Sequence, residues 1–150
     1  MELVVWQHSR TLTQEIFRHS QGFPGEEKFS LSDQIRRSSR SIGAQIAEAW
    51  GKRRNERHFI SKLTDADADA DAEQYETQHW LIQAYDAGYL NRDEVSDLGR
   101  RCKAIGSMIG GMISVSHQFC QGGDSTTGRK REDSTLDRFF APPPDGLFGL

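Results

Sequence analysis

Apolar residues recur every three to four positions over most of the first 120 residues, which is the spacing of one face of an α-helix. Four segments carry this pattern, at about residues 2–20, 31–50, 56–88 and 91–120. No segment combines the strict alternation and the β-branched residues that are typical of a β-strand. Four helices with short connections predict an all-α fold, an antiparallel up-down four-helix bundle.

The second segment has the clearest division into two faces. Gly43 interrupts it and predicts a bend or a close approach of a neighbouring helix. In the fourth segment, Gly106 and Gly110 lie four residues apart and predict a similar close contact. The apolar stripe of the second segment consists of Leu31, Ile35, Ile42, Ile46 and the pair Ala49/Trp50.

The ends of the helices are marked by residues that start or stop helical structure. These signals are a Gly- and Pro-containing loop at 21–29, a serine cap at Ser30 or Ser32, a turn at 51–55, a glycine stop at Gly88, and a capping box of Asn91 with Glu94.

Composition divides the chain into two parts. Only 35% of the 150 residues are hydrophobic, and the stretch after Cys120 is rich in Gly, Ser and charged residues before a proline triplet. We therefore predict a bundle domain at 1–120 and a disordered, flexible tail at 121–150. The chain shows no export signal and no membrane-length apolar run, and Cys102 and Cys120 are too far apart on one helix to pair. These features favour a reducing cytoplasm and no membrane association.

Several blocks of sequence resemble one known family. The residues that carry the resemblance are QIRRSSRSIGAQIAEAWGKRR (34–54), Phe59, Leu63, Ala66, ETQHWL (76–81) and GYL (88–90). They resemble the "four helix bundle protein" family, which includes the proteins encoded by intervening sequences in bacterial large-subunit ribosomal RNA genes. It also includes the accessory variability determinant of diversity-generating retroelements. The resemblance covers about residues 1–120.

The resemblance implies an up-down bundle that commonly assembles into a homopentamer and has no known catalytic residues. It further implies that accessory members bind nucleic acid and a reverse transcriptase through basic surface. The chain departs from the family pattern at Gly43, where proline is usual, at Gln45, where asparagine is usual, and at Ala49, where glycine is frequent. An Asp-Ala repeat also lengthens the span 63–76 by four residues, which is about one helical turn.

The Asp-Ala repeat has the spacing of a calcium loop in part. With Asp65 at position one, Asp67 and Asp69 fall at positions three and five, and Glu76 falls at position twelve. Ala70 then stands at position six, where the sharp turn of such a loop needs glycine. We therefore favour a solvated acidic helix over a calcium site.

Other chemistry is equally weakly supported. Glu76 and His79 match the Glu-x-x-His unit of carboxylate di-iron bundles, but the chain lacks the second copy that such a site needs. Neither a nucleophile elbow nor a phosphate-binding glycine loop is present. The sequence predicts no metal site, no cofactor and no catalytic residue, and therefore a protein that is not an enzyme.

Two groups of cations in the stretch 31–57, on the second segment and just after it, are the remaining signal. We name Arg36, Arg37 and Arg40 the first basic cluster, and Lys52, Arg53, Arg54 and Arg57 the second basic cluster. Within 31–57 these seven cations face only three acids, whereas 58–90 carries seven acids and one lysine. Arginines can bind phosphates of RNA or DNA without reading sequence. They can equally pair with the nearby acids, and this charge balance favours structural pairing.

Two hypotheses therefore stay open. In the first, the protein is a non-enzymatic oligomeric scaffold whose seven clustered cations contact RNA, DNA or a nucleic-acid enzyme such as a reverse transcriptase. In the second, it is an assembly or adaptor protein whose arginines serve subunit contacts. Both expect self-association, because a small core does not absorb all of the large aromatic area. The aromatic residues concerned are Trp6, Trp50, Trp80, Tyr85 and Tyr89. The family resemblance implies that the oligomer is a pentamer.

Overall fold

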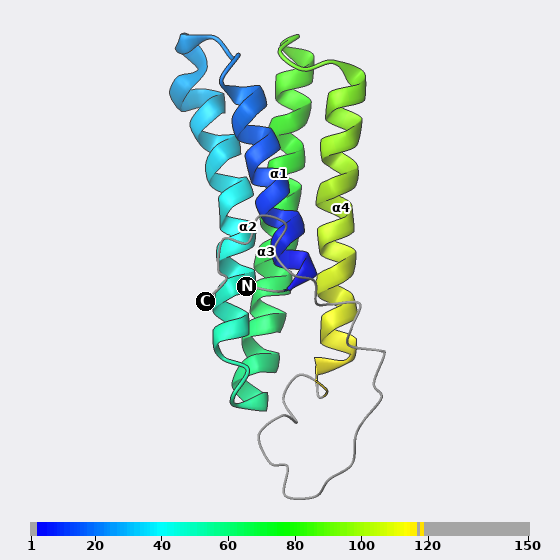
Figure 1. Ribbon diagram of the computed structural model, residues 1–150. Coiled ribbons are helices and arrows are strands. Elements are labelled where there is room, and N and C mark those ends of the chain that lie inside the picture. Colours follow the sequence, from blue (N-terminus) through cyan, green and yellow to red (C-terminus); the bar gives the residue numbers. More distant parts are fainter. Residues whose placement is uncertain (1–2, 117, 119–150) are drawn as a thin grey trace, which may run out of the picture.

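The computed structural model describes residues 3–116 and 118, and every regular element among them is a helix (Figure 1). None of these helices is long and apolar enough to cross a membrane. The four α-helices are α1 (Val4–Ser20), α2 (Asp33–Gly51), α3 (Glu56–Asp86) and α4 (Arg92–Ser114).

The helices form the predicted antiparallel up-down bundle (Figure 1). Helix α2 packs against α1 and α3, and α4 closes the bundle against α3 and α1. The α2–α3 contact includes a buried hydrogen bond, because the Thr77 hydroxyl donates to Ser38 Oγ over 3.0 Å. The predicted tail at 121–150 lies outside the described residues.

One continuous core runs through the bundle. All residues of the predicted α2 stripe are buried except Trp50, which is half-buried and packs against the core. Ile42 on α2 is 0% exposed, as are Leu12 on α1, Phe59 on α3 and Cys102 on α4. The periodicity of the sequence therefore identified the inner face of α2 correctly, and this face fixes which side of α2 points outward.

The predicted signals at the α3–α4 connection are confirmed. Gly88 adopts φ of +78°, a left-handed conformation that glycine reaches without steric strain. The Asn91 side chain accepts from the Glu94 backbone N–H over 2.9 Å, and the Glu94 carboxylate accepts from the Asn91 N–H over 2.8 Å. This capping box satisfies two backbone groups at the start of α4.

The serine cap predicted for α2 is wrong. The loop at 21–29 contains a 3₁₀ turn (Gly25–Glu27) and the start of a π-helix (Lys28–Ser32), which runs directly into α2. Ser32 is therefore already helical, and its side chain makes no capping bond. Ser30 instead donates to the Glu27 carboxylate. A helix that continues from a preceding turn leaves no free N–H groups for a cap to satisfy.

Two glycines inside helices, Gly43 and Gly110, differ in how closely other atoms approach them. A Cβ at Gly43 would lie 3.0 Å from Ser9 Oγ, so α1 and α2 meet closely here, as predicted. At Gly110 no atom lies within 4 Å of the Cβ position, and the residue is exposed. The predicted close contact is therefore wrong at Gly110, because it faces outward from α4.

Candidate nucleic-acid interface

Arg36, in the first basic cluster, joins α2 to the end of α1. Its Nε donates to Ser20 Oγ over 2.7 Å, and its guanidinium carbon lies 4.9 Å from the centroid of the Phe17 ring. Ser20 is buried and Arg36 is half-buried. A planar guanidinium can stack on a ring and donate sideways at the same time. Arg36 therefore has a structural role in the contact between α1 and α2.

The other two members of the first basic cluster are held less firmly. Arg37 donates to Gln34 Oε1 over 3.2 Å and lies 3.8 Å from the Glu76 carboxylate of α3. Arg40 is exposed, and its guanidinium carbon lies 6.0 Å from the Phe17 ring centroid. Within a little over one helical turn, the first basic cluster thus changes from Arg36, which is held by contacts with α1, to Arg40, which is exposed.

The second basic cluster lies in the turn from α2 to α3 and on the first turn of α3. Arg53 folds back onto α2, where it donates to the Trp50 carbonyl over 3.1 Å and stacks 4.4 Å from the Trp50 ring centroid. Lys52, Arg54 and Arg57 are exposed. Among the described residues, these three side chains make no hydrogen bond or ion pair. They therefore present three open positive charges at one end of the bundle.

Several cations outside the two clusters are paired within their own helices. Arg18 pairs with Glu15 on α1, and Arg100 and Arg101 both contact Asp97 on α4, at 3.5 and 2.8 Å. The hydrogen bond from Arg101 lowers the pKa of the Asp97 carboxyl from its usual value. Such pairing neutralises local charge and leaves little positive potential for a ligand. The second basic cluster differs because its exposed members, Lys52, Arg54 and Arg57, make no such pair among the described side chains.

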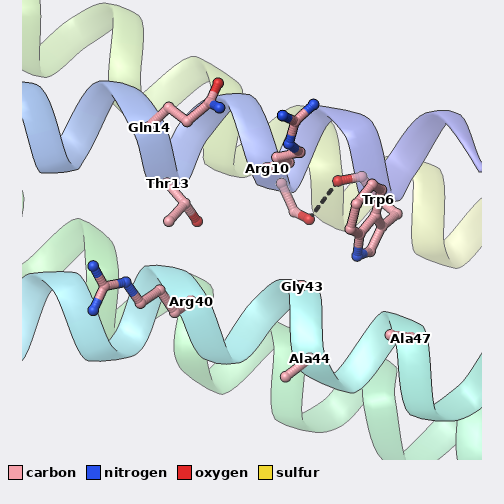
Figure 2. Close-up of a pocket in the computed structure, with 9 residues that line it drawn as sticks. Trp6, Arg10, Thr13, Gln14, Arg40, Gly43, Ala44 and Ala47 are labelled. Atoms are coloured by element: carbon pink, nitrogen blue, oxygen red, sulfur yellow. Dashed lines mark hydrogen bonds between the residues drawn. The ribbon is translucent and has the colours of Figure 1, made fainter. Parts of the chain in front are cut away.

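A groove between α1 and α2 lies between the two clusters (Figure 2). Its volume is about 290 Å³, and Trp6 reaches from α1 toward α2 at one end while Arg40 lies at the other. A hydrogen bond of 3.0 Å from Thr13 Oγ1 to the Ser39 carbonyl ties the two helices beside it. The groove is lined by Trp6, Ser9, Arg10, Thr13, Gln14, Arg40, Gly43, Ala44 and Ala47.

This groove was not predicted from the sequence. The one feature of the sequence that indicates the groove is the succession of small residues Gly43, Ala44 and Ala47 on the α2 face that also carries Arg40. Trp6 and Arg10 come from α1, and no pattern along the chain places them opposite that face. Only the antiparallel packing of α1 on α2 brings them there.

The structure accounts in other ways for the residues that were considered for a calcium site, a di-iron site or thiol chemistry. Residues 65–76 belong to the continuous helix α3, so the backbone does not form the loop that a calcium site needs. The Glu76 carboxylate accepts from Trp80 Nε1 over 3.1 Å, and His79 is exposed. Burial raises the pKa of the Cys102 thiol to about 12, so it stays protonated at neutral pH and is a core residue.

The fold and the sequence now agree with one family of known proteins. The family model of the 23S rRNA-intervening sequence proteins matches residues 1–111. The chain belongs to this family. Comparison with curated proteins gave no match.

A solved structure supports the assignment to the 23S rRNA-intervening sequence protein family. It is a protein of unknown function from the S23 ribosomal protein family of Bacteroides thetaiotaomicron, with 30% sequence identity and a TM-score of 0.60. The match covers 73% of this chain and 98% of that chain. The predicted family resemblance is thereby confirmed, whereas the biochemical role has to be argued from the surface of this member.

Proposed function

We propose that this protein is a non-enzymatic oligomeric scaffold that contacts the backbone of RNA or DNA through the second basic cluster. The observation that carries the proposal is the exposure of Lys52, Arg54 and Arg57 without a partner among the described residues. Cations already paired with acids gain little from a phosphate, whereas unpaired ones release counterions when they bind. A nucleic-acid enzyme that carries acidic surface, such as a reverse transcriptase, is a further partner for the same cations.

Exposed apolar side chains on the outer face of α3 support the self-association that is part of this proposal. Tyr75 is 67% exposed and Ile82 is 53% exposed, and their spacing of seven residues places both on one side of the helix. Tyr85 is 43% exposed nearby, whereas the tryptophans pack partly against the core. Exposed apolar area of this kind favours association, and we propose a homopentamer. A ring repeats the second basic cluster, so that individually weak phosphate contacts act together.

The test compares two triple variants with the same change in charge. The first carries Lys52→Glu, Arg54→Glu and Arg57→Glu, and the control carries Arg92→Glu, Arg100→Glu and Lys103→Glu at exposed sites on α4. We expect the first variant to lose binding of unrelated RNA and DNA at low salt, and the control to keep most of it. The affinity of the native protein should fall steeply with salt. Equal loss in both variants, or a binding curve that is flat at low salt, would contradict the proposal.

A second candidate function follows from the first basic cluster. Arg36 and Arg37 contact α1 and α3 within one chain, which shows that arginines of this surface can hold helices together. An assembly or adaptor protein without a nucleic-acid role would use the second basic cluster for subunit contacts in the same way. Light scattering separates the two functions, because loss of the oligomer in the Lys52/Arg54/Arg57 variant would favour this second candidate. The free thiol of Cys102 fits the reducing cytoplasm that we propose as the compartment for either function.

A further inference from the structure

The groove between α1 and α2 runs along the α2 face that joins the two basic clusters. Arg40, Ala44 and Ala47 follow one another at helical spacing on this face, and Gly51 continues it into the turn that carries Lys52. Lys52 lies twelve positions after Arg40, which is about 18 Å along the helix axis. The groove therefore fills the interval between the open end of the first basic cluster and the second.

The floor of the groove is formed by small side chains. Gly43 has no room for a Cβ without pressing on Ser9 Oγ, and Ser9 is itself fixed by a 2.7 Å hydrogen bond to the Trp6 carbonyl. Ala44 and Ala47 add only a methyl group each. The depth of the groove thus depends on residues that are easily enlarged by substitution.

The walls of the groove combine an aromatic surface with positive charge. The indole of Trp6 lies at the end nearer the α2–α3 turn, and Arg40 lies at the opposite end (Figure 2). Arg10 lines the α1 side, and none of the nine lining residues is acidic. An apolar floor, an indole face and a cationic rim suit a planar, uncharged group attached to anionic groups on either side.

We propose that the groove takes an unpaired base of single-stranded RNA or DNA, with Trp6 as the stacking surface. Phosphates farther along the same strand, on either side of this base, then lie against Arg40 at one end and against Lys52 and Arg54 at the other. This inference rests on the proposed function, and it narrows the ligand from nucleic acid in general to a single strand. At a stacked spacing of about 3.4 Å per phosphate, 18 Å corresponds to roughly five nucleotides, and to fewer in an extended strand.

A single strand fits these observations better than the alternatives. In a duplex the bases are stacked and paired, so the flat face of a base cannot lie against the Trp6 indole in this groove. An acidic peptide matches the charge, but its carboxylates do not use the indole face. Base–aromatic stacking is the interaction that uses both the ring and the cations.

The test fills the groove without changing its charge. Ala47→Leu and, in a second variant, Ala44→Leu place a larger side chain on the floor, and Ala72→Leu at an exposed site on α3 is the control. Affinity for an oligothymidylate and for a duplex of mixed sequence is measured by fluorescence anisotropy. We expect the two groove variants to bind the single strand about tenfold more weakly, with unchanged duplex binding and unchanged melting temperature.

Photocross-linking supplies a second readout that does not depend on a variant. An oligothymidylate that carries 5-iodouracil should cross-link to the α1 peptide that contains Trp6. Cross-links confined to the α2–α3 turn, together with full single-strand affinity in both groove variants, would overturn the groove assignment while leaving the proposed function intact. Tighter binding of a polyglutamate peptide, sensitive to Ala47→Leu, would overturn it in favour of a protein ligand. Absence of binding to either nucleic acid at low salt would instead contradict the proposed function itself.

Discussion

The two basic clusters follow each other along α2, the turn after it and the first turn of α3, yet their side chains are used differently. Arg36 stacks on Phe17 and donates to Ser20, whereas Arg54 and Arg57 have no such contacts among the described residues. Residue type does not explain this difference, because all are arginines on the same basic stretch. The surroundings of each cluster decide whether its cations stabilise the fold or remain open to a ligand.

The lengths of the helices set those surroundings. Near the first basic cluster α2 is flanked by the end of α1, which supplies Phe17 and Ser20, and by α3, which supplies Glu76. The second basic cluster lies where α2 and α3 extend beyond the start of α1 at Val4 (Figure 1). No α1 residue is available there to accept hydrogen bonds from the arginines. Among the described residues, a long α2–α3 pair beside a shorter α1 thus leaves the second basic cluster without contacts from α1.

The largest effect is expected from the buried inner face of α2, which holds in place the helix that carries the first basic cluster. Ile42 is 0% exposed, so Ile42→Asp would bury an unpaired carboxylate at a cost of several kcal/mol, against a total stability of about 5–15 kcal/mol. We predict loss of the folded state, measured as the loss of the cooperative melting transition by circular dichroism. Ser41→Asp, at a half-buried position one residue away, is the control and should keep the transition. An unchanged melting curve for Ile42→Asp would show that the inner face of α2 has been assigned wrongly.

Most of the fold followed from local signals in the sequence. The stripe that contains Ile42, the capping box of Asn91 and the stop at Gly88 all act within one helix or one turn, so periodicity and residue type were enough. The start of α2 was not predictable in the same way. There a π-turn joins the loop to the helix, and serine spacing alone does not distinguish a cap from a residue that is already helical.

The candidate site was predictable only in part. The sequence identified all seven cations but not their partners, because Ser20 and Phe17 lie 16 and 19 positions before Arg36, on a different helix. It identified Gly43 as a point of close approach but not the groove beside it, since the wall at Trp6 depends on how α1 packs against α2. The two clusters differ because of contacts between helices, which patterns within one helix do not reveal.

A matched pair of truncations sharpens the comparison between the clusters. Arg36→Ala removes the hydrogen bond to Ser20 and the stacking on Phe17, and we expect it to lower the free energy of unfolding by about 1–2 kcal/mol. Arg54→Ala removes no contact among the described residues, so we expect a change within about 0.5 kcal/mol. Urea denaturation of both variants measures the difference. Equal changes in the free energy of unfolding in the two variants would show that both clusters contribute alike to the stability of the fold.

The smallest effect is expected at Arg37, whose contacts are intermediate between those of Arg36 and those of Arg54. Its guanidinium is 3.8 Å from the Glu76 carboxylate, and the two side chains are 74% and 36% exposed, so we expect a coupling free energy of about 0.3 kcal/mol that disappears at high salt. A double-mutant cycle with Arg37→Ala and Glu76→Gln measures it, because glutamine can still accept from Trp80 Nε1. A coupling above about 1 kcal/mol would place Arg37 with Arg36 as a structural arginine. A coupling near zero leaves Arg37 free to exchange Glu76 for a phosphate, and the open positive surface then extends from the second basic cluster along the groove and past Arg40.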